Sequence, residues 1–264
     1  MDDVLGYEGK KVVVTGAASG MGAATAGLLV DVGADVHALD VQDFSLDGAS
    51  VRQVDLKDAA SIDTAVERIG GDVQAVFSVA GLPGPPFSDL DTMTVNFLGA
   101  RHLIETLVPT MAPGAAAVCV ASNAGLGWQQ ELDFWMPLLQ TPDFAAGLAW
   151  CEDHPDLIAT GYAPSKKVVN AYVAWRGTQL IADPGIRLNV VNPGPTETAM
   201  MPAFEALAGK ELIDAFVGPS GRRCQAEEQA WPMLFLNSPR LTYVAAEALH
   251  VDGGFLGAMT TGQL

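Results

Sequence analysis

Short apolar runs alternate with helical stretches along nearly the whole chain. Residues 10–15 read KKVVVT, a β-branched run that stops at a cluster of glycines, and such a run is typical of a strand buried on both faces. Residues 21–32 are rich in Ala and Leu and end at Gly33, which predicts a helix closed by a glycine. A second strand is predicted at residues 35–39.

The same alternation continues towards the C-terminus. Further strands are predicted at residues 51–55, 73–79, 115–121, 186–191 and 248–251. Helices are predicted at residues 62–69, 91–107, 163–181 and 225–236. Because alternating strands and helices form a parallel sheet covered on both faces, we expect a single-domain, doubly wound α/β fold over residues 1–264. Ligands of such sheets bind beyond the carboxyl ends of the strands.

Composition and charge argue against several classes of binding partner. With 49% hydrophobic and 17% charged residues the chain is typical of a globular protein. The net charge of -17 argues against a nucleic acid or an anionic membrane as partner. No signal peptide or membrane-spanning run is visible, so we expect a cytoplasmic protein. Three cysteines without CxxC spacing, and histidines without HExxH spacing, predict neither a disulfide framework nor a metal site.

A glycine-rich turn follows the first predicted strand. Residues 15–22, TGAASGMG, are called the glycine turn below. Backbone N–H groups and a helix dipole at such a turn can hold a pyrophosphate, although glycines also serve simple tight turns. Asp40 ends the second strand, where a carboxylate can accept hydrogen bonds from ribose hydroxyls and repel a 2′-phosphate. No Arg or Lys stands beside it, so NAD is favoured over NADP. Asp55 is predicted to face the adenine.

A second group of residues points to proton transfer. Tyr162 and Lys166 are four positions apart and share one face of a predicted helix. A nearby cation stabilises phenolate, which predicts a lowered tyrosine pKa suited to a general acid/base. Spacing alone is weak, because Tyr7 and Lys11 repeat it. Ser122, after the fifth strand, can hold a substrate oxygen or serve as a plain cap.

Taken together, these motifs resemble the short-chain dehydrogenase/reductase family over nearly the whole chain. The resemblance rests on the glycine turn, Asp40, Asp55, the pair Ala80-Gly81, Val95-Asn96, Ser122, Tyr162 with Lys166, and PGPTET at residues 193–198. It implies a Rossmann-type fold and NAD-dependent oxidation of an alcohol or reduction of a carbonyl. It also implies a homo-oligomer, either a dimer or a tetramer.

The resemblance implies a role for each site residue. Tyr162 is the acid/base, Lys166 binds the nicotinamide ribose and tunes Tyr162, Ser122 positions the substrate oxygen, and Asn96 holds a water in the proton relay. The predicted cofactor contacts are Gly16, Ser19, Gly20, Met21, Gly22, Asp40, Val41, Asp55, Leu56, Ala80, Gly81, Tyr162, Lys166, Pro193, Gly194, Thr196 and Thr198. Residues 193–198 would hold the carboxamide.

Two departures from the family pattern are informative. Ser78-Val79 stands where the family usually has two asparagines, so a polar contact between the central strands is altered. Ser122 and Tyr162 are separated by an extra segment at about residues 126–161, called the insertion below. The long insertion resembles the bacterial 3α-hydroxysteroid dehydrogenase/carbonyl reductase branch and the related coniferyl alcohol dehydrogenases. Its many apolar residues form a subunit interface or a small satellite core, or else contact substrate.

The predicted pocket is apolar. Residues 195–220 resemble a substrate lid, and the substrate contacts we predict are Leu82, Trp128, Met200, Met201 and Phe204. We therefore predict a bulky, weakly polar alcohol or ketone as substrate. A hydroxysteroid is the first candidate, and an aromatic (coniferyl-type) or terpenoid alcohol is the alternative. The net charge disfavours a phosphorylated or acyl-carrier substrate. The alternative function of another class is a non-catalytic NAD-sensing protein. Such a protein need not keep all four catalytic side chains, and their presence here favours an enzyme.

Overall fold

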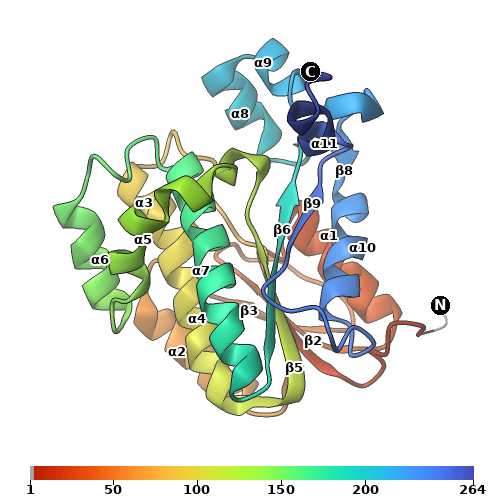
Figure 1. Ribbon diagram of the computed structural model, residues 1–264. Coiled ribbons are helices and arrows are strands. Elements are labelled where there is room, and N and C mark those ends of the chain that lie inside the picture. The colour runs from red at the N-terminus through yellow and green to blue at the C-terminus, as the bar shows by residue number, and fades with distance from the viewer. Residues whose placement is uncertain (1–2) are drawn as a thin grey trace.

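The computed structural model describes residues 3–264 and is built around a seven-stranded sheet (Figure 1). All its strands are parallel, in the order β3-β2-β1-β4-β5-β6-β9, which confirms the doubly wound α/β prediction. The strands are β1 (Lys11–Thr15), β2 (Asp35–Asp40), β3 (Ala49–Gln53), β4 (Val73–Ser78), β5 (Met111–Val120), β6 (Arg187–Pro193) and β9 (Ala248–Val251). A small separate sheet pairs β7 (Thr196–Glu197) with β8 (Cys224–Gln225).

Helices cover both faces of the large sheet. In Figure 1 α1 and α10 lie on one side of it, and α2, α4 and α7 lie on the other. The bounds are α1 (Gly20–Asp31), α2 (Ala59–Ile69), α3 (Asp89–Met93), α4 (Ala100–Leu107), α5 (Leu132–Leu139), α6 (Phe144–Asp153), α7 (Tyr162–Ala182), α8 (Met201–Ala208), α9 (Lys210–Asp214), α10 (Ala226–Asn237) and α11 (Phe255–Thr260).

The sheet separates two hydrophobic cores, one on each of its faces. Side chains alternate across a strand, so Val12 and Val14 of β1 enter the core beneath α1 and α10. Val13 enters the opposite core, under α2, α4 and α7. All three are fully buried, which explains why the strand reads as an unbroken β-branched run.

The order of the strands creates the crevice that the fold offers to ligands. From β1 the chain moves outward to β2 and β3, then returns to place β4 on the other side of β1. The loops after β1 and β4 therefore diverge at the carboxyl edge of the sheet. In Figure 1 helices α8 and α9 stand above this edge.

The structure differs from the prediction at several places. The fifth strand begins at Met111 rather than at residue 115. The third strand ends at Gln53, not at residue 55, because the Asp55 carboxylate accepts a hydrogen bond from the Lys57 amide at 2.8 Å and starts a turn. The helix predicted at residues 91–107 is divided into α3 and α4 by a π-helical turn at Thr94–Gly99. The insertion, which showed no clear periodicity, contains α5 and α6.

The insertion packs against the main body of the protein. Trp135, Leu138, Leu139 and Phe144 are buried in the same core as α7 and α4. Arg101 of α4 ties the segment down, since its guanidinium donates to the carbonyls of Leu138 and Asp143 at 3.1 and 2.9 Å. These side chains thus extend the main core, so no separate satellite core is needed to account for them.

Candidate active site

A cavity of about 690 Å³ opens at the carboxyl edge of the sheet. Its wall includes every predicted cofactor contact, from Gly16 to Thr198. Ser122, Tyr162 and Lys166 line the same cavity. The structure therefore brings the glycine turn and the proposed proton-transfer residues into one continuous space.

The glycine turn is packed so closely that side chains are excluded. Gly16 has a φ of +71°, and a Cβ there would lie 2.8 Å from the Cα of Ala80. A Cβ on Gly22 would lie only 2.1 Å from the Gly16 carbonyl oxygen. The backbone of the turn can thus approach a ligand directly, and α1 begins there with its N-terminus at the cavity. These residues fit a dinucleotide pyrophosphate.

Thr15 links the end of β1 to the loop after β4. Its Oγ1 accepts hydrogen bonds from the amides of Val79 and Ala80 at 3.0 and 3.1 Å. The residue ends β1 and is buried, so the bond ties the ends of β1 and β4 together beneath the crevice. Ser78, buried in β4, does not disturb this link.

Asp40 anchors the loop around it. Its Oδ2 accepts from the Ala18 amide at 3.0 Å and its Oδ1 from the Gln42 amide at 2.9 Å. The carboxylate is therefore held at the wall of the cavity beside the glycine turn. Lys57 also lines the cavity, a cation that the sequence analysis did not single out, and its Nζ is 3.1 Å from Asp91 Oδ1.

Tyr162 and Lys166 lie on the first turns of α7, as the spacing predicted. The Lys166 ammonium donates to the Val120 carbonyl at 3.0 Å and lies 5.4 Å from the centre of the Tyr162 ring. Gly81 lies close by, since a Cβ on it would be 3.1 Å from Asn96 Oδ1 and 3.6 Å from Lys166 Nζ. Ser122 accepts from the Ala124 amide at 3.1 Å, so its hydroxyl is a cap as well as part of the cavity wall.

Burial dominates the titration of this pair. It raises the pKa of the Tyr162 phenol, although a side-chain hydrogen bond with Ser122 opposes the rise. Burial also lowers the pKa of Lys166 to about 8, with a small opposite effect from Cys119. The prediction that Lys166 lowers the pKa of Tyr162 is therefore outweighed, in the protein alone, by the loss of water around the phenol.

Asn96 lies behind the cavity wall. Its Oδ1 accepts from the Leu82 amide at 2.6 Å, and its Nδ2 donates to the Leu82 carbonyl and to Ser165 Oγ at 3.0 and 2.9 Å. It stands in the π-helical turn at Thr94–Gly99, a local widening that recurs at functional sites. The side chain thus joins the loop after β4 to α7.

Most of the residues predicted to contact substrate lie on the apolar wall of the cavity. Leu82, Met200, Met201 and Phe204 line the cavity. Trp128 does not, because it packs against the core formed by α4 and α7. Four further apolar residues that line the cavity are Phe87, Val95, Ile213 and Phe216.

A pair of buried asparagines supports the site from below. Asn192, near the end of β6, accepts from the Ser122 amide at 3.2 Å and exchanges two hydrogen bonds with Asn170. Asn170 also donates to the Lys166 carbonyl at 2.9 Å. The pair was not predicted from the sequence, although a polar residue one turn after Lys166 on a buried helix was a visible signal.

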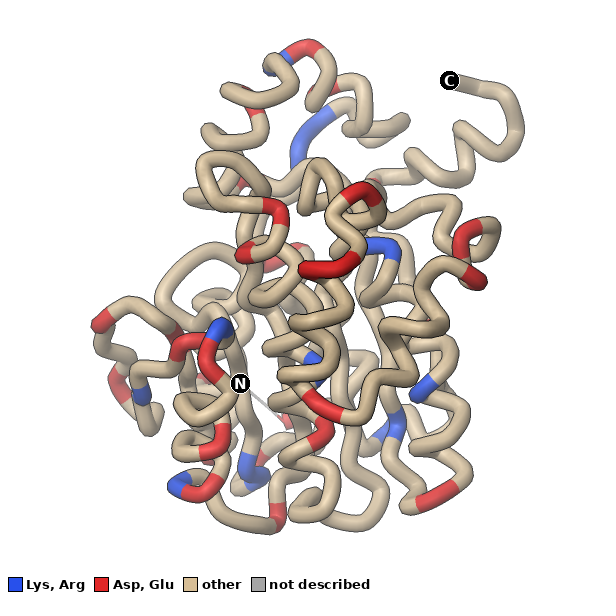
Figure 2. The backbone as a smooth tube through the Cα atoms, turned by 90° about the vertical axis from the view of Figure 1, so that its left-hand side faces the viewer, with Lys and Arg blue, Asp and Glu red and all other residues tan. Residues whose placement is uncertain are grey.

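Few features of the described residues suggest other ligands. Figure 2 shows acidic positions spread over many elements, with the basic positions isolated among them. Within residues 3–264 no group of three or more His, Cys, Asp or Glu is placed to hold a metal ion. None of the helices in this range is long and apolar enough to cross a membrane.

Comparison with known proteins identifies the family. Residues 10–132 match the family model described as short chain dehydrogenase, and residues 158–256 match one described as Enoyl-(Acyl carrier protein) reductase. The chain belongs to the short-chain dehydrogenase/reductase family. As a member of this family it is an oxidoreductase that acts on alcohols with a nicotinamide cofactor.

Among its relatives are two bacterial enzymes of the branch that the insertion resembled. A coniferyl-alcohol dehydrogenase of Pseudomonas sp. is 29% identical over 93% of this chain and 96% of the relative. A 3-alpha-hydroxysteroid dehydrogenase/carbonyl reductase of Comamonas testosteroni is 29% identical over 94% and 97%. The crystal structure of the 3-alpha-hydroxysteroid dehydrogenase from Pseudomonas sp. B-0831 complexed with NADH has a TM-score of 0.81 and 28% identity, covering 97% of this chain and all of that one.

Proposed function

We propose that this short-chain dehydrogenase/reductase is an NAD-dependent alcohol dehydrogenase/carbonyl reductase for a bulky apolar substrate, first of all a hydroxysteroid. The observation that carries the proposal is one cavity that combines the glycine turn and Asp40 with Tyr162, beneath an apolar lid. An aromatic alcohol of the coniferyl type is the second candidate, since relatives named for each activity are 29% identical to this chain.

The cofactor preference follows from charge. A carboxylate at the end of β2 can accept the ribose hydroxyls of NAD, whereas it would repel the 2′-phosphate of NADP. Lys57 is the cation that could favour NADP, but its ammonium faces Asp91. The solved relative was crystallised with NADH, which is consistent with the same preference. We therefore infer NAD.

The glycine turn and Asp40 would hold NAD, which would supply the acceptor for a hydride from the alcohol carbon. Tyr162 takes the hydroxyl proton as the carbonyl forms, and in the reverse direction returns it to the oxygen. Ser122 holds that oxygen through its hydroxyl. Lys166 supplies the positive charge that favours phenolate, an effect that the cofactor's own positive ring would strengthen. Asn96, which joins the loop after β4 to α7, keeps these elements in register.

The decisive experiment removes the proton path alone. Tyr162→Phe keeps the ring, and therefore the packing of the site, but has no hydroxyl. We expect its kcat to fall by at least about a hundredfold with steroid or coniferyl alcohols and NAD, measured by NADH absorbance. NAD binding, followed by fluorescence titration, should persist. Normal turnover by this variant would rule out the mechanism, and the absence of turnover in the unmodified protein would favour the NAD-sensing alternative.

A further inference from the structure

Arg223 lies among three carboxylates on the outer side of the lid. Its side chain is only 10% exposed, and it precedes β8. The guanidinium is 2.6 Å from Glu205 of α8, 2.8 Å from Asp214 of α9 and 3.3 Å from Glu197 of β7. A single arginine thus links both lid helices to the small sheet, and its charge offsets part of the repulsion among the three carboxylates.

The adjoining side of α8 faces the proposed catalytic tyrosine. Phe204, next to Glu205 in the chain, meets the Tyr162 ring edge-on, with ring centres 4.8 Å apart and planes inclined by 64°. It also lines the cavity. The ion pair and the aromatic contact are therefore made by consecutive residues of one short helix, so a shift of Glu205 moves Phe204.

Apolar packing holds the lid only weakly. Met201 is the one buried residue of α8, and α9 has none. The two helices pack mainly against each other, and in Figure 1 they stand clear of the body of the protein. With so little buried surface, the position of the lid depends strongly on the contacts of Arg223.

We propose that Arg223 is a positioning residue that holds α8 and α9 over the cavity, keeps Phe204 against Tyr162, and so sets the preference for bulky apolar substrates. This inference rests on the proposed function for its kinetic consequence. Its structural consequence, a lid fastened by one arginine, does not depend on turnover.

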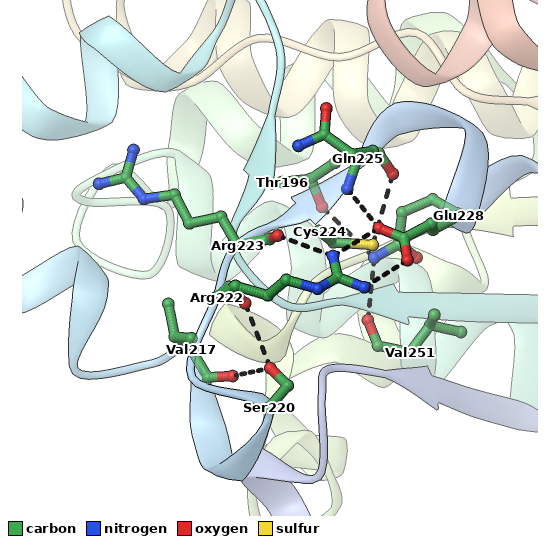
Figure 3. A network of polar contacts seen from close by, with 10 residues as sticks. Thr196, Val217, Ser220, Arg222, Arg223, Cys224, Gln225, Glu228 and Val251 are labelled. Carbon is green, nitrogen blue, oxygen red and sulfur yellow. Dashed lines mark hydrogen bonds and ion pairs between the residues drawn. The ribbon is translucent and has the colours of Figure 1, made fainter.

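The neighbouring arginine provides a matched control. Arg222 is 61% exposed and contacts Glu228 of α10 through two hydrogen bonds of 2.7 and 2.6 Å. In Figure 3 its side chain runs to Glu228, whereas the Arg223 side chain extends away from that network. Substitution of Arg222 removes one positive charge at the adjacent position of the chain, together with the hydrogen bond from its guanidinium to the Arg223 carbonyl at 3.2 Å. It leaves the side-chain contacts of Arg223 with the lid intact.

The kinetic test compares R223Q, R223K and R222Q at saturating NAD. For R223Q we expect the KM of a steroid alcohol to rise at least about fivefold, with kcat within about twofold, because binding to the lid is lost in ground and transition states alike. The KM of a small alcohol, which contacts less of the lid than a steroid does, should rise much less. R223K, which keeps a cation, should recover part of the loss, and R222Q should behave as the unmodified protein does.

A second variant guards against misfolding of the first. E205Q breaks the same ion pair from the other side, and its effect on the steroid KM should not add to that of R223Q in the double variant. Additive effects, an equal rise of KM for small and large alcohols, or the same change in R222Q would each overturn the inference.

A proteolytic measurement tests the lid without relying on activity. Lys210 begins α9, and its side chain is 68% exposed and paired with Asp214. Because its backbone belongs to the helix, cleavage after it by a lysine-specific protease requires α9 to open. We expect cleavage at this site to be at least about fivefold faster in R223Q than in R222Q. Equal rates would overturn the role of Arg223 even if the enzyme proved active. Faster cleavage in a protein that oxidises no alcohol would instead remove the proposed function and leave the lid contact standing.

Discussion

At the scale of single residues, Tyr162 and Lys166 show how much a side chain depends on its surroundings. Their spacing places them on one helix face, but Tyr7 and Lys11 have the same spacing with another result. Tyr7 is buried, its hydroxyl donates to the Leu234 carbonyl at 2.6 Å, and it does not line the cavity. What distinguishes the second pair is its place at the carboxyl edge of the sheet.

Asp40 is the residue on which the cofactor preference can be tested. In Asp40→Ala we expect the ratio of kcat/KM for NADP to that for NAD to rise at least about tenfold, because the charge that repels a 2′-phosphate is gone. The substitution also removes the acceptors of the Ala18 and Gln42 amides.

Asp40→Asn serves as the control for those lost hydrogen bonds. It keeps one acceptor and nearly the same shape but is neutral, so the two variants separate charge from loop geometry. Steady-state kinetics with both cofactors provide the measurement. An unchanged ratio in both variants would remove Asp40 from the argument for NAD.

At the scale of elements, the insertion is the segment whose sequence was hardest to interpret. Its apolar residues allowed an interface, a small core or a substrate contact, because composition does not say which surface a side chain meets. In the structure α5 and α6 lean against α7 and the π-helical turn, and four large side chains complete the main core. The same packing keeps Trp128 away from the cavity wall.

The role of the insertion in stability can be measured at Leu138. Its side chain is fully buried, so Leu138→Ala should lower the free energy of unfolding by about 3 kcal/mol through lost burial and a residual cavity. Phe134 lies in the same helix but is 56% exposed. Phe134→Ala should therefore change the free energy of unfolding by less than about 0.5 kcal/mol. Urea unfolding with an unchanged m-value is the measurement. Equal effects of the two variants would mean that α5 does not belong to the core.

The elements of the sheet were predicted well, and the irregular ones were not. Strands buried on both faces are mostly apolar, so β1 and β4 are visible from sequence alone. The π-helical turn at Thr94–Gly99 has no such signature, because an apolar helix and its widened form use the same residues. The early end of β3 depends on one side-chain hydrogen bond at Asp55, which a hydrophobic pattern does not reveal.

At the scale of the whole molecule, the buried Lys166 connects the site to global stability. Burial lowers its pKa from 10.5 to about 8. Between these pH values Lys166 binds a proton in the unfolded chain but not in the folded protein. The free energy of unfolding therefore increases as the pH rises. The gain attributable to Lys166 amounts to about 3 kcal/mol across this window.

Lys166→Met removes this contribution. The difference in unfolding free energy between the unmodified protein and this variant, both without cofactor, should increase from about pH 7.5 to about pH 10. Taking the difference cancels the opposite, destabilising effect of buried groups such as Cys151, whose pKa is raised to about 12. Urea unfolding at several pH values measures it. Parallel pH curves for the two proteins would show that Lys166 keeps an ordinary pKa in the folded state.

The sequence by itself determined the alternation of elements, the glycine turn, and the order of Asp40, Ser122, Tyr162 and Lys166 along the chain. These are local patterns, and local patterns survive without knowledge of neighbours in space. Only the tertiary structure decided that the insertion completes the core, that burial raises the pKa of Tyr162, and that Arg223 reaches both lid helices. Each of these depends on which distant residues exclude water or meet across the fold, and one-dimensional spacing carries no record of that.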